Sequence, residues 1–84
     1  MDESLSTKQL AWVLGRSANS IRGDIRTGDI DGTRIPSGFR IPRVEVLRLA
    51  RSKVEAEAGR KLSDGELERL IDEVIATNEA ASGA

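Results

Sequence analysis

The sequence predicts a small, mainly α-helical fold with one β-hairpin, and three observations support this prediction. Four segments carry apolar residues at helical spacing, with capping residues or glycines at their ends. Two short alternating segments flank a turn at residues 36–38, which is typical of a hairpin. The chain has 84 residues, so one compact core is expected.

The first helix is predicted to begin after Ser6. Ser6 with Gln9 three residues later is the pattern of a capping box. Leu5 and Leu10 flank this start at the spacing of a hydrophobic staple. Gly15 is expected to end the helix, because glycine tolerates the left-handed conformation just after a helix end.

A second helix is predicted almost immediately afterwards. Ser17 is its expected N-cap, and Gly28 is expected to end it. Ala18, Ile21 and Ile25 form a row that faces the core. The turn between the two helices is so short that the helices must cross steeply.

The hairpin and a third helix follow. Residues 33–35 and 39–41 are the predicted strands, and Pro42 suits the first turn of a helix over residues 43–58. The predicted core face of this helix consists of Val44, Leu47, Ala50 and Val54. Val46 and Leu49 lie on another side, so the helix is expected to pack against two neighbours.

A fourth helix is predicted to start at Ser63, which forms a second capping box with Glu66. Its apolar stripe consists of Leu67, Leu70, Ile71, Val74 and Ile75. This stripe either closes the core or joins subunits. Trp12 lies opposite the apolar stripe of the first helix, which consists of Leu10, Val13 and Leu14. We expect the fourth helix or another subunit to cover Trp12 together with Val46 and Leu49.

Composition excludes several classes of function. The chain has no Cys and no His, which rules out thiol chemistry, zinc-finger sites and imidazole-based catalysis. No nucleophile stands near a base at a convincing spacing, so we expect no enzymatic activity, no metal and no cofactor. No apolar run is long enough for a membrane span and no signal peptide opens the chain, which predicts a cytoplasmic protein.

The net charge of −1 conceals a segregation of charge. Residues 1–53 hold ten Lys/Arg and six Asp/Glu, a charge of +4, whereas residues 54–84 hold three and eight, a charge of −5. The basic half is therefore a candidate for binding nucleic acid although the whole chain is slightly acidic.

Arginines concentrate around the second helix and the hairpin. The two groups are Arg16, Arg22 and Arg26 at the helix, and Arg34, Arg40 and Arg43 at the hairpin. Guanidinium groups suit phosphates and guanine edges alike. At the start of the second helix, Asn19, Ser20 and Arg22 are the candidates for contacting base edges, and Ser17 with the first amides could hold a phosphate. The arginines Arg26, Arg34 and Arg40 are expected to neutralise the backbone.

A plainer interpretation stays open for these residues. Arginines at helical spacing often form a solvated face, and Asp24 and Asp29 are available as ion-pair partners. Gly23 falls near the middle of the exposed side of the second helix, at a cost of about 1 kcal/mol relative to alanine. Close approach of the helix backbone to DNA explains this glycine, and so does simple tolerance.

Residues 5–53 resemble the excisionase and MerR-type winged helix–turn–helix family. The motifs that carry the resemblance are VLG at 13–15, SANS at 17–20, RTGDI at 26–30 and RIP at 40–42. The resemblance implies that the second helix enters the DNA major groove and that the hairpin is a wing on the flanking backbone or minor groove. The implied contact positions are Ser17, Asn19, Ser20, Arg22, Gly23 and Arg26 on the helix and Arg34, Ser37, Gly38 and Arg40 on the wing. Arg16 beside the helix, and Thr33 and Arg43 beside the hairpin, complete the candidate site.

The expected organisation is a flexible N-terminus (1–4), a DNA-binding domain (5–59), an amphipathic helix (60–78) and a disordered tail (79–84). The expected function is sequence-specific binding of double-stranded DNA, by a transcriptional regulator or an excisionase-like architectural factor in recombination, in a bacterial, phage or plasmid context at the nucleoid. The alternatives are a protein-interaction adaptor that uses the acidic fourth helix, and a DNA-segregation factor. Self-association or cooperative assembly on DNA, and a protein partner on the fourth helix, are left open.

Overall fold

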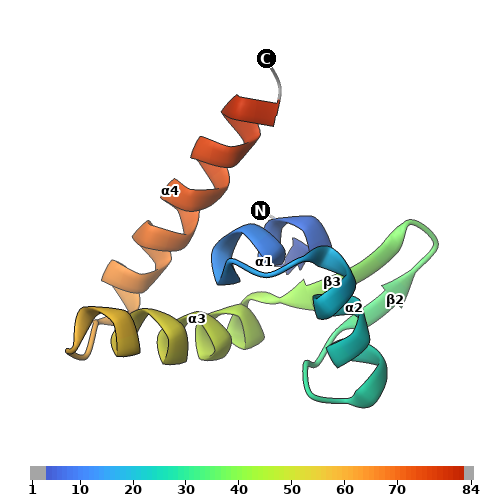
Figure 1. Cartoon of the computed structure of the whole chain (residues 1–84), viewed down its shortest axis with the longest axis horizontal. Coiled ribbons are helices and arrows are strands. Elements are labelled where there is room, and N and C mark those ends of the chain that lie inside the picture. Colours follow the sequence, from blue (N-terminus) through green and yellow to red (C-terminus); the bar gives the residue numbers. More distant parts are fainter. Residues whose placement is uncertain (1–3, 83–84) are drawn as a thin grey trace.

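The computed structural model describes residues 4–82, which form four helices and a three-stranded antiparallel sheet (Figure 1). In chain order the elements are β1 (Ser4–Ser6), α1 (Thr7–Leu14), α2 (Ala18–Thr27), β2 (Thr33–Ile35), β3 (Gly38–Pro42), α3 (Arg43–Ala58) and α4 (Asp64–Ser82). The expected mainly helical architecture with a small hairpin is confirmed. None of the helices within residues 4–82 combines the length and the apolar character that crossing a membrane requires.

The starts and ends of α1 and α2 follow the capping pattern of the sequence. Ser6 Oγ accepts a hydrogen bond from Gln9 N at 3.2 Å, and Ser6 N donates to Gln9 Oε1 at 3.0 Å, which completes the predicted capping box. Ser17 Oγ likewise accepts from a backbone N–H of the first turn of α2. Gly15 and Gly28 end the two helices with φ of 65° and 90°, a region that favours glycine.

The sheet contains one strand that the sequence analysis did not predict. β1 pairs antiparallel with β3, and Leu5 lies opposite Ile41, with both side chains buried. This apolar pair next to Leu10 gives the short strand a reason to form. Ser4 belongs to β1, so the expectation of a flexible N-terminus is wrong for Ser4, whereas residues 1–3 lie outside the described part.

α3 has the predicted bounds but buries a different face. Val46 and Ala50 are fully buried, whereas Val44 is 74% exposed, so the predicted core face is wrong at Val44. The reason is that α3 packs against α1, α4 and the sheet at once, which centres its buried arc on Ala50. Pro42 is the N-cap residue of α3 rather than a residue of its first turn.

α4 packs against α1 and α3 of its own chain and closes the core. Leu67 and Ile71 are buried, and Val74 and Ile75 pack half-buried beside them. Leu70 is 39% exposed, so this member of the predicted stripe lies outside the core. Its position on the helix turns it away from α1 and α3.

The C-terminal end of α4 is longer than expected. The helix continues through Ser82, so the prediction of a disordered tail is wrong for residues 79–82, and residues 83–84 lie outside the described part. Asn78 Nδ2 donates to Val74 O at 2.8 Å, and two alanines follow, which favour a helix. Glu79 also accepts a hydrogen bond from Gln9 of α1 at 3.3 Å, which ties the helix end to the body.

Candidate nucleic-acid interface

α2 turns one side to the core and the other to solvent. Ile21 is fully buried, and Ala18 and Ile25 pack half-buried beside it. Because an α-helix has 3.6 residues per turn, Asn19 and Gly23 lie on the side away from this row. Asn19 is exposed, and a Cβ atom added at Gly23 meets no other atom within 4 Å. The outward side of α2 is therefore open to a ligand.

The two flanks of α2 differ in charge. Arg22 and Arg26 are four residues apart and project from the flank next to the hairpin. Ser20 and Asp24, also four residues apart, project from the opposite flank. This arrangement gives the hairpin side of α2 two positive charges.

Three arginines gather around a surface hollow of about 330 Å³ between α2 and the hairpin. Its lining residues are Arg22, Arg26, Arg34, Ile35, Pro36, Gly38 and Phe39. No carboxylate is among them, so the hollow is a local positive surface on a chain with a net charge of −1. Gly38 has φ of 139°, which only glycine adopts readily, and so its identity follows from the hairpin turn. Ser37 is exposed at this turn.

Two of the three arginines keep their donors available. Arg22 Nη1 donates to Asn19 Oδ1 at 2.7 Å. Arg26 and Arg34 are exposed and form no ion pair or side-chain hydrogen bond with any residue of 4–82. Each guanidinium carries five N–H donors in a planar fork that matches a phosphate. Arg26 and Arg34 are thus the most accessible donors at this hollow.

Arg40, which was also predicted to contact DNA from the hairpin, does not line this hollow. In the β2–β3 register Arg34 lies opposite Phe39, and Thr33 lies opposite Arg40. Adjacent residues of a strand point to opposite faces. Arg40 and Thr33 therefore lie on one face of the hairpin, and Arg34 lies on the other. Arg40 Nε donates to Ser4 Oγ at 2.9 Å, and Arg40 Nη2 donates to Ser4 O at 2.8 Å. The arginine therefore fastens β1 to the sheet.

Arg43 is also withdrawn from the predicted site. Its Nη2 donates to Asp72 Oδ1 at 2.8 Å, and its Nε donates to Glu68 Oε1 at 3.4 Å. Its side chain is 22% exposed. Arg43 is thus paired with carboxylates of the acidic helix α4, and its contact with DNA from the hairpin stays a prediction.

Arg16 forms one of the ion pairs that the plainer interpretation of the arginines anticipates. Its Nη2 lies 2.6 Å from Asp24 Oδ2, and its Nε donates to Ser20 Oγ at 3.1 Å. Asp29 instead accepts a hydrogen bond from Thr27 Oγ1 at 3.2 Å. Arg16 therefore lies along the flank of α2 that faces away from the hairpin.

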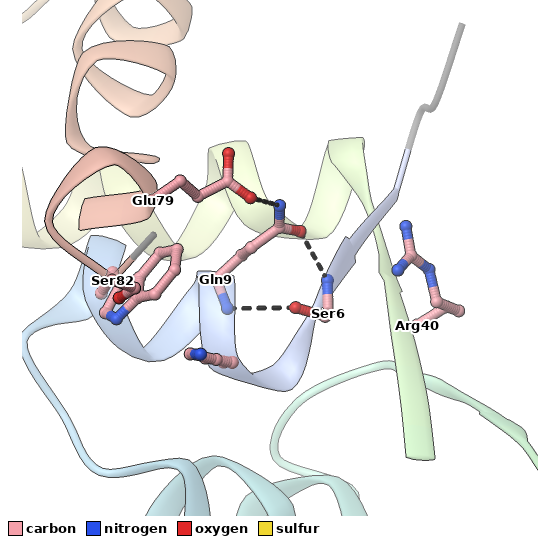
Figure 2. A pocket seen from close by; sticks show the side chains of 7 residues that line it. Ser6, Gln9, Arg40, Glu79 and Ser82 are labelled. Carbon is pink, nitrogen blue, oxygen red and sulfur yellow. Dashed lines mark hydrogen bonds between the residues drawn. The ribbon is translucent and has the colours of Figure 1, made fainter. Parts of the chain in front are cut away.

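Trp12 is half-buried beside the C-terminal end of α4. Lys8 Nζ lies 5.4 Å from the centre of its ring, a cation–π contact. A hollow of about 450 Å³ opens here, lined by Ser6, Lys8, Gln9, Trp12, Arg40, Glu79 and Ser82. Figure 2 shows Gln9 between Ser6 and Glu79, both of which it contacts by hydrogen bonds.

The expectation for Trp12 is therefore confirmed in part. The end of α4 does lie beside Trp12, as the shared hollow shows. Val46 and Leu49 belong elsewhere: Val46 is fully buried in the main core, and Leu49 packs half-buried against that core.

Glu45, which was not predicted as a functional residue, is a buried carboxylate that holds the loop before the hairpin. Glu45 is 6% exposed and accepts from Arg48 Nε at 2.8 Å, Arg48 Nη2 at 2.7 Å and Asp31 N at 3.0 Å. The hydrogen bonds from Arg48 and Asp31 hold the pKa of Glu45 below its ordinary value. Asp31 lies between α2 and β2, so Glu45 ties that loop to α3. The i,i+3 spacing of Glu45 and Arg48 was the available signal.

Comparison of the chain with protein-family models, with curated proteins and with solved structures finds no match. The resemblance to excisionase and MerR-type proteins therefore rests on the four sequence motifs, and the candidate interface rests on the geometry described above.

Proposed function

We propose that this chain is a sequence-specific double-stranded DNA-binding protein of the winged helix–turn–helix type. α2 enters the major groove, and the β2–β3 hairpin lies on the flanking backbone. In this role the protein acts as a transcriptional regulator or as an excisionase-like architectural factor in recombination, at the nucleoid in the cytoplasm.

The observation that carries the proposal is the hollow between α2 and the hairpin. It brings Arg22, Arg26 and Arg34 together from two elements, without a carboxylate in its lining. Two of these guanidinium groups have no partner within residues 4–82 and are ready to contact phosphates. Three positive charges of the first half of the chain thus gather where the proposed complex has a DNA backbone beside α2.

The outward side of α2 supports a role in the recognition of DNA bases. Asn19 is exposed near the N-terminal end of the helix, where side chains of a recognition helix meet base edges. Asn can pair bidentately with adenine, and Arg22, hydrogen-bonded to Asn19, can do so with guanine. Gly23, one turn after Asn19, leaves this side of α2 without a side chain, which permits close approach of the backbone.

Two experiments in sequence test the proposal. The protein first selects its preferred sites from a pool of random duplexes of about 20 base pairs, roughly two helical turns. Fluorescence anisotropy then measures its affinity for the selected duplexes. We expect one sequence class to be enriched. Arg26→Gln and Arg34→Gln each remove one phosphate contact and weaken binding about eightfold at about 0.1 M salt. The matched control is Arg69→Gln, because Arg69 is an exposed arginine on α4. We expect the affinity of this variant for the duplex to equal that of the wild type.

Asn19→Ala separates reading from electrostatic attraction. It relaxes the preference at one base pair by about 1–3 kcal/mol and leaves affinity for unrelated duplexes unchanged. The absence of any duplex affinity at low salt refutes the proposal and favours the protein-interaction adaptor, for which the acidic outer face of α4 is the available surface.

A further inference from the structure

A second hollow lined by positive charge lies beside α2, and the proposed function does not use it. It has a volume of about 370 Å³ and is formed by the end of α1, the α1–α2 turn and α3. Its lining residues are Leu14, Arg16, Arg48, Leu49, Ser52 and Lys53. Three of the six are cations and none is a carboxylate, as at the hollow of the hairpin side. The hollows at Trp12 and at Leu70, by contrast, include glutamates in their linings.

The two positive hollows lie on opposite flanks of α2. Arg16, which lines the second hollow, contacts Ser20 and Asp24 on one side of the helix. Arg22 and Arg26 line the first hollow from the other side. Two residues along an α-helix correspond to a rotation of more than half a turn, so these flanks face apart. Arg16 borders this second flank of α2, and Arg48 and Lys53 extend the positive surface from Arg16 onto α3.

Arg48 and Lys53 of the second hollow remain accessible although each has an acidic neighbour. Arg48 is 60% exposed and spends two donors on the buried Glu45, which leaves others for a ligand. Lys53 Nζ pairs with Glu57 at 3.1 Å, and Glu57 is exposed. An exposed i,i+4 pair of this kind contributes only a few tenths of a kcal/mol, so a phosphate can replace the carboxylate.

Positive charge on both flanks of one helix matches the geometry of the DNA major groove. The major groove is about 12 Å wide, and a helix with its side chains is about 10–12 Å across. A helix that enters the groove therefore fills it and has the phosphates of one strand on each flank. A helix bound along a single backbone needs cations on one flank only.

From this we infer that the Arg16–Arg48–Lys53 hollow binds a backbone phosphate of the DNA strand opposite the one that the hairpin contacts. This inference rests on the proposed function, because it assigns a second anchoring point to the same DNA complex. Neither Arg48 nor Lys53 belongs to the α2–hairpin site, and their contact extends the footprint to both strands.

Lys53→Gln tests the inference with the matched control Lys61→Gln. Both are lysine-to-glutamine changes, but Lys61 is exposed in the α3–α4 connection, which lies at the opposite end of the molecule from α2 in Figure 1. We expect Lys53→Gln to lower the slope of log K against log salt by about 0.9 and to weaken binding about eightfold at about 0.1 M salt. Lys61→Gln leaves both quantities unchanged. Circular dichroism verifies that the variants keep the helical content of the wild type.

A second readout locates the contact on a strand. Neutral methylphosphonate linkages are placed one at a time in the duplex obtained by selection. We expect methylphosphonate linkages at particular positions on both strands to weaken binding of the wild type. In Lys53→Gln the linkages on one strand no longer weaken binding, and in Arg34→Gln those on the other strand no longer do so.

The outcomes separate this inference from the proposed function. If Arg34→Gln lowers the salt slope but Lys53→Gln and the stronger change Lys53→Glu do not, the second contact is refuted while DNA binding stands. Sensitivity confined to one strand refutes it as well. If the wild type binds no duplex, both proposals fail.

Discussion

Replacing Gly23 with alanine is expected to stabilise the protein and to weaken DNA binding at the same time. Gly23 lies inside α2 without a positive φ, and an added Cβ meets no atom within 4 Å. The substitution therefore recovers most of the helix-propensity difference of about 1 kcal/mol without a clash. For a domain of this size, such a gain raises Tm by about 4–8 °C.

The same methyl group is harmful in the DNA complex. It projects from the outward ridge of α2, where the backbone approaches the groove, and forcing a methyl group into a close-packed contact costs about 1 kcal/mol or more. We expect affinity to fall at least about fivefold. Thermal unfolding followed by circular dichroism and anisotropy titration measure the two effects on the same sample.

Gly65→Ala serves as the control for this prediction. Gly65 lies in the first turn of α4, and a Cβ there also meets no atom within 4 Å. We expect a smaller gain in stability and an unchanged affinity. A Gly23→Ala variant that is more stable and binds DNA as tightly as the wild type refutes the placement of α2 in the groove; one that is less stable contradicts the helix geometry itself.

Three further predictions concern stability. Leu67→Ala removes a fully buried side chain of α4 and is expected to cost about 2–5 kcal/mol in urea unfolding, whereas Leu70→Ala costs much less because that side chain is 39% exposed. Folding lowers the pKa of Glu45, so the contribution of its ionised carboxylate to the free energy of unfolding is complete above the ordinary pKa of 4.5 and is lost as the pH falls through the lowered pKa. Glu45→Gln is expected to abolish this part of the destabilisation by acid. A pH profile of stability that is the same in the variant and the wild type contradicts this prediction. Ser63→Ala breaks a capping box and is expected to cost about 1 kcal/mol, with Tm as the readout.

The local structure was predictable where neighbouring residues determine it. The capping boxes at Ser6 and Ser63 and the helix ends at Gly15 and Gly28 depend on residues within one helical turn, and the structure contains all of them. The range of α3 was also predictable, because Pro42 marks its start clearly.

Features that depend on distant parts of the chain were not predictable. β1 depends on pairing with β3, in which Leu5 meets Ile41, 36 residues away. α3 has apolar residues on two faces, and the sequence does not show which of them meets α1 and α4, so Val44 was assigned to the core in error.

The candidate site shows the same limit. Arg22, Arg26 and Arg34 were recognised as candidates, and the structure brings them together. Arg40 and Arg43 have the same charge and lie near the same hairpin, but the strand register and the acidic helix α4 direct them to other partners. Charge and spacing indicate which residues could bind a phosphate; only the tertiary fold decides which of them remain available.

The salt dependence of duplex binding by the wild-type chain tests the central claim most directly. Two phosphate contacts from Arg26 and Arg34 predict that log K falls linearly with log salt with a slope of about −1.8 or steeper. A slope near zero, or no measurable binding to any duplex at low salt, contradicts the claim that this acidic chain presents a basic surface for DNA.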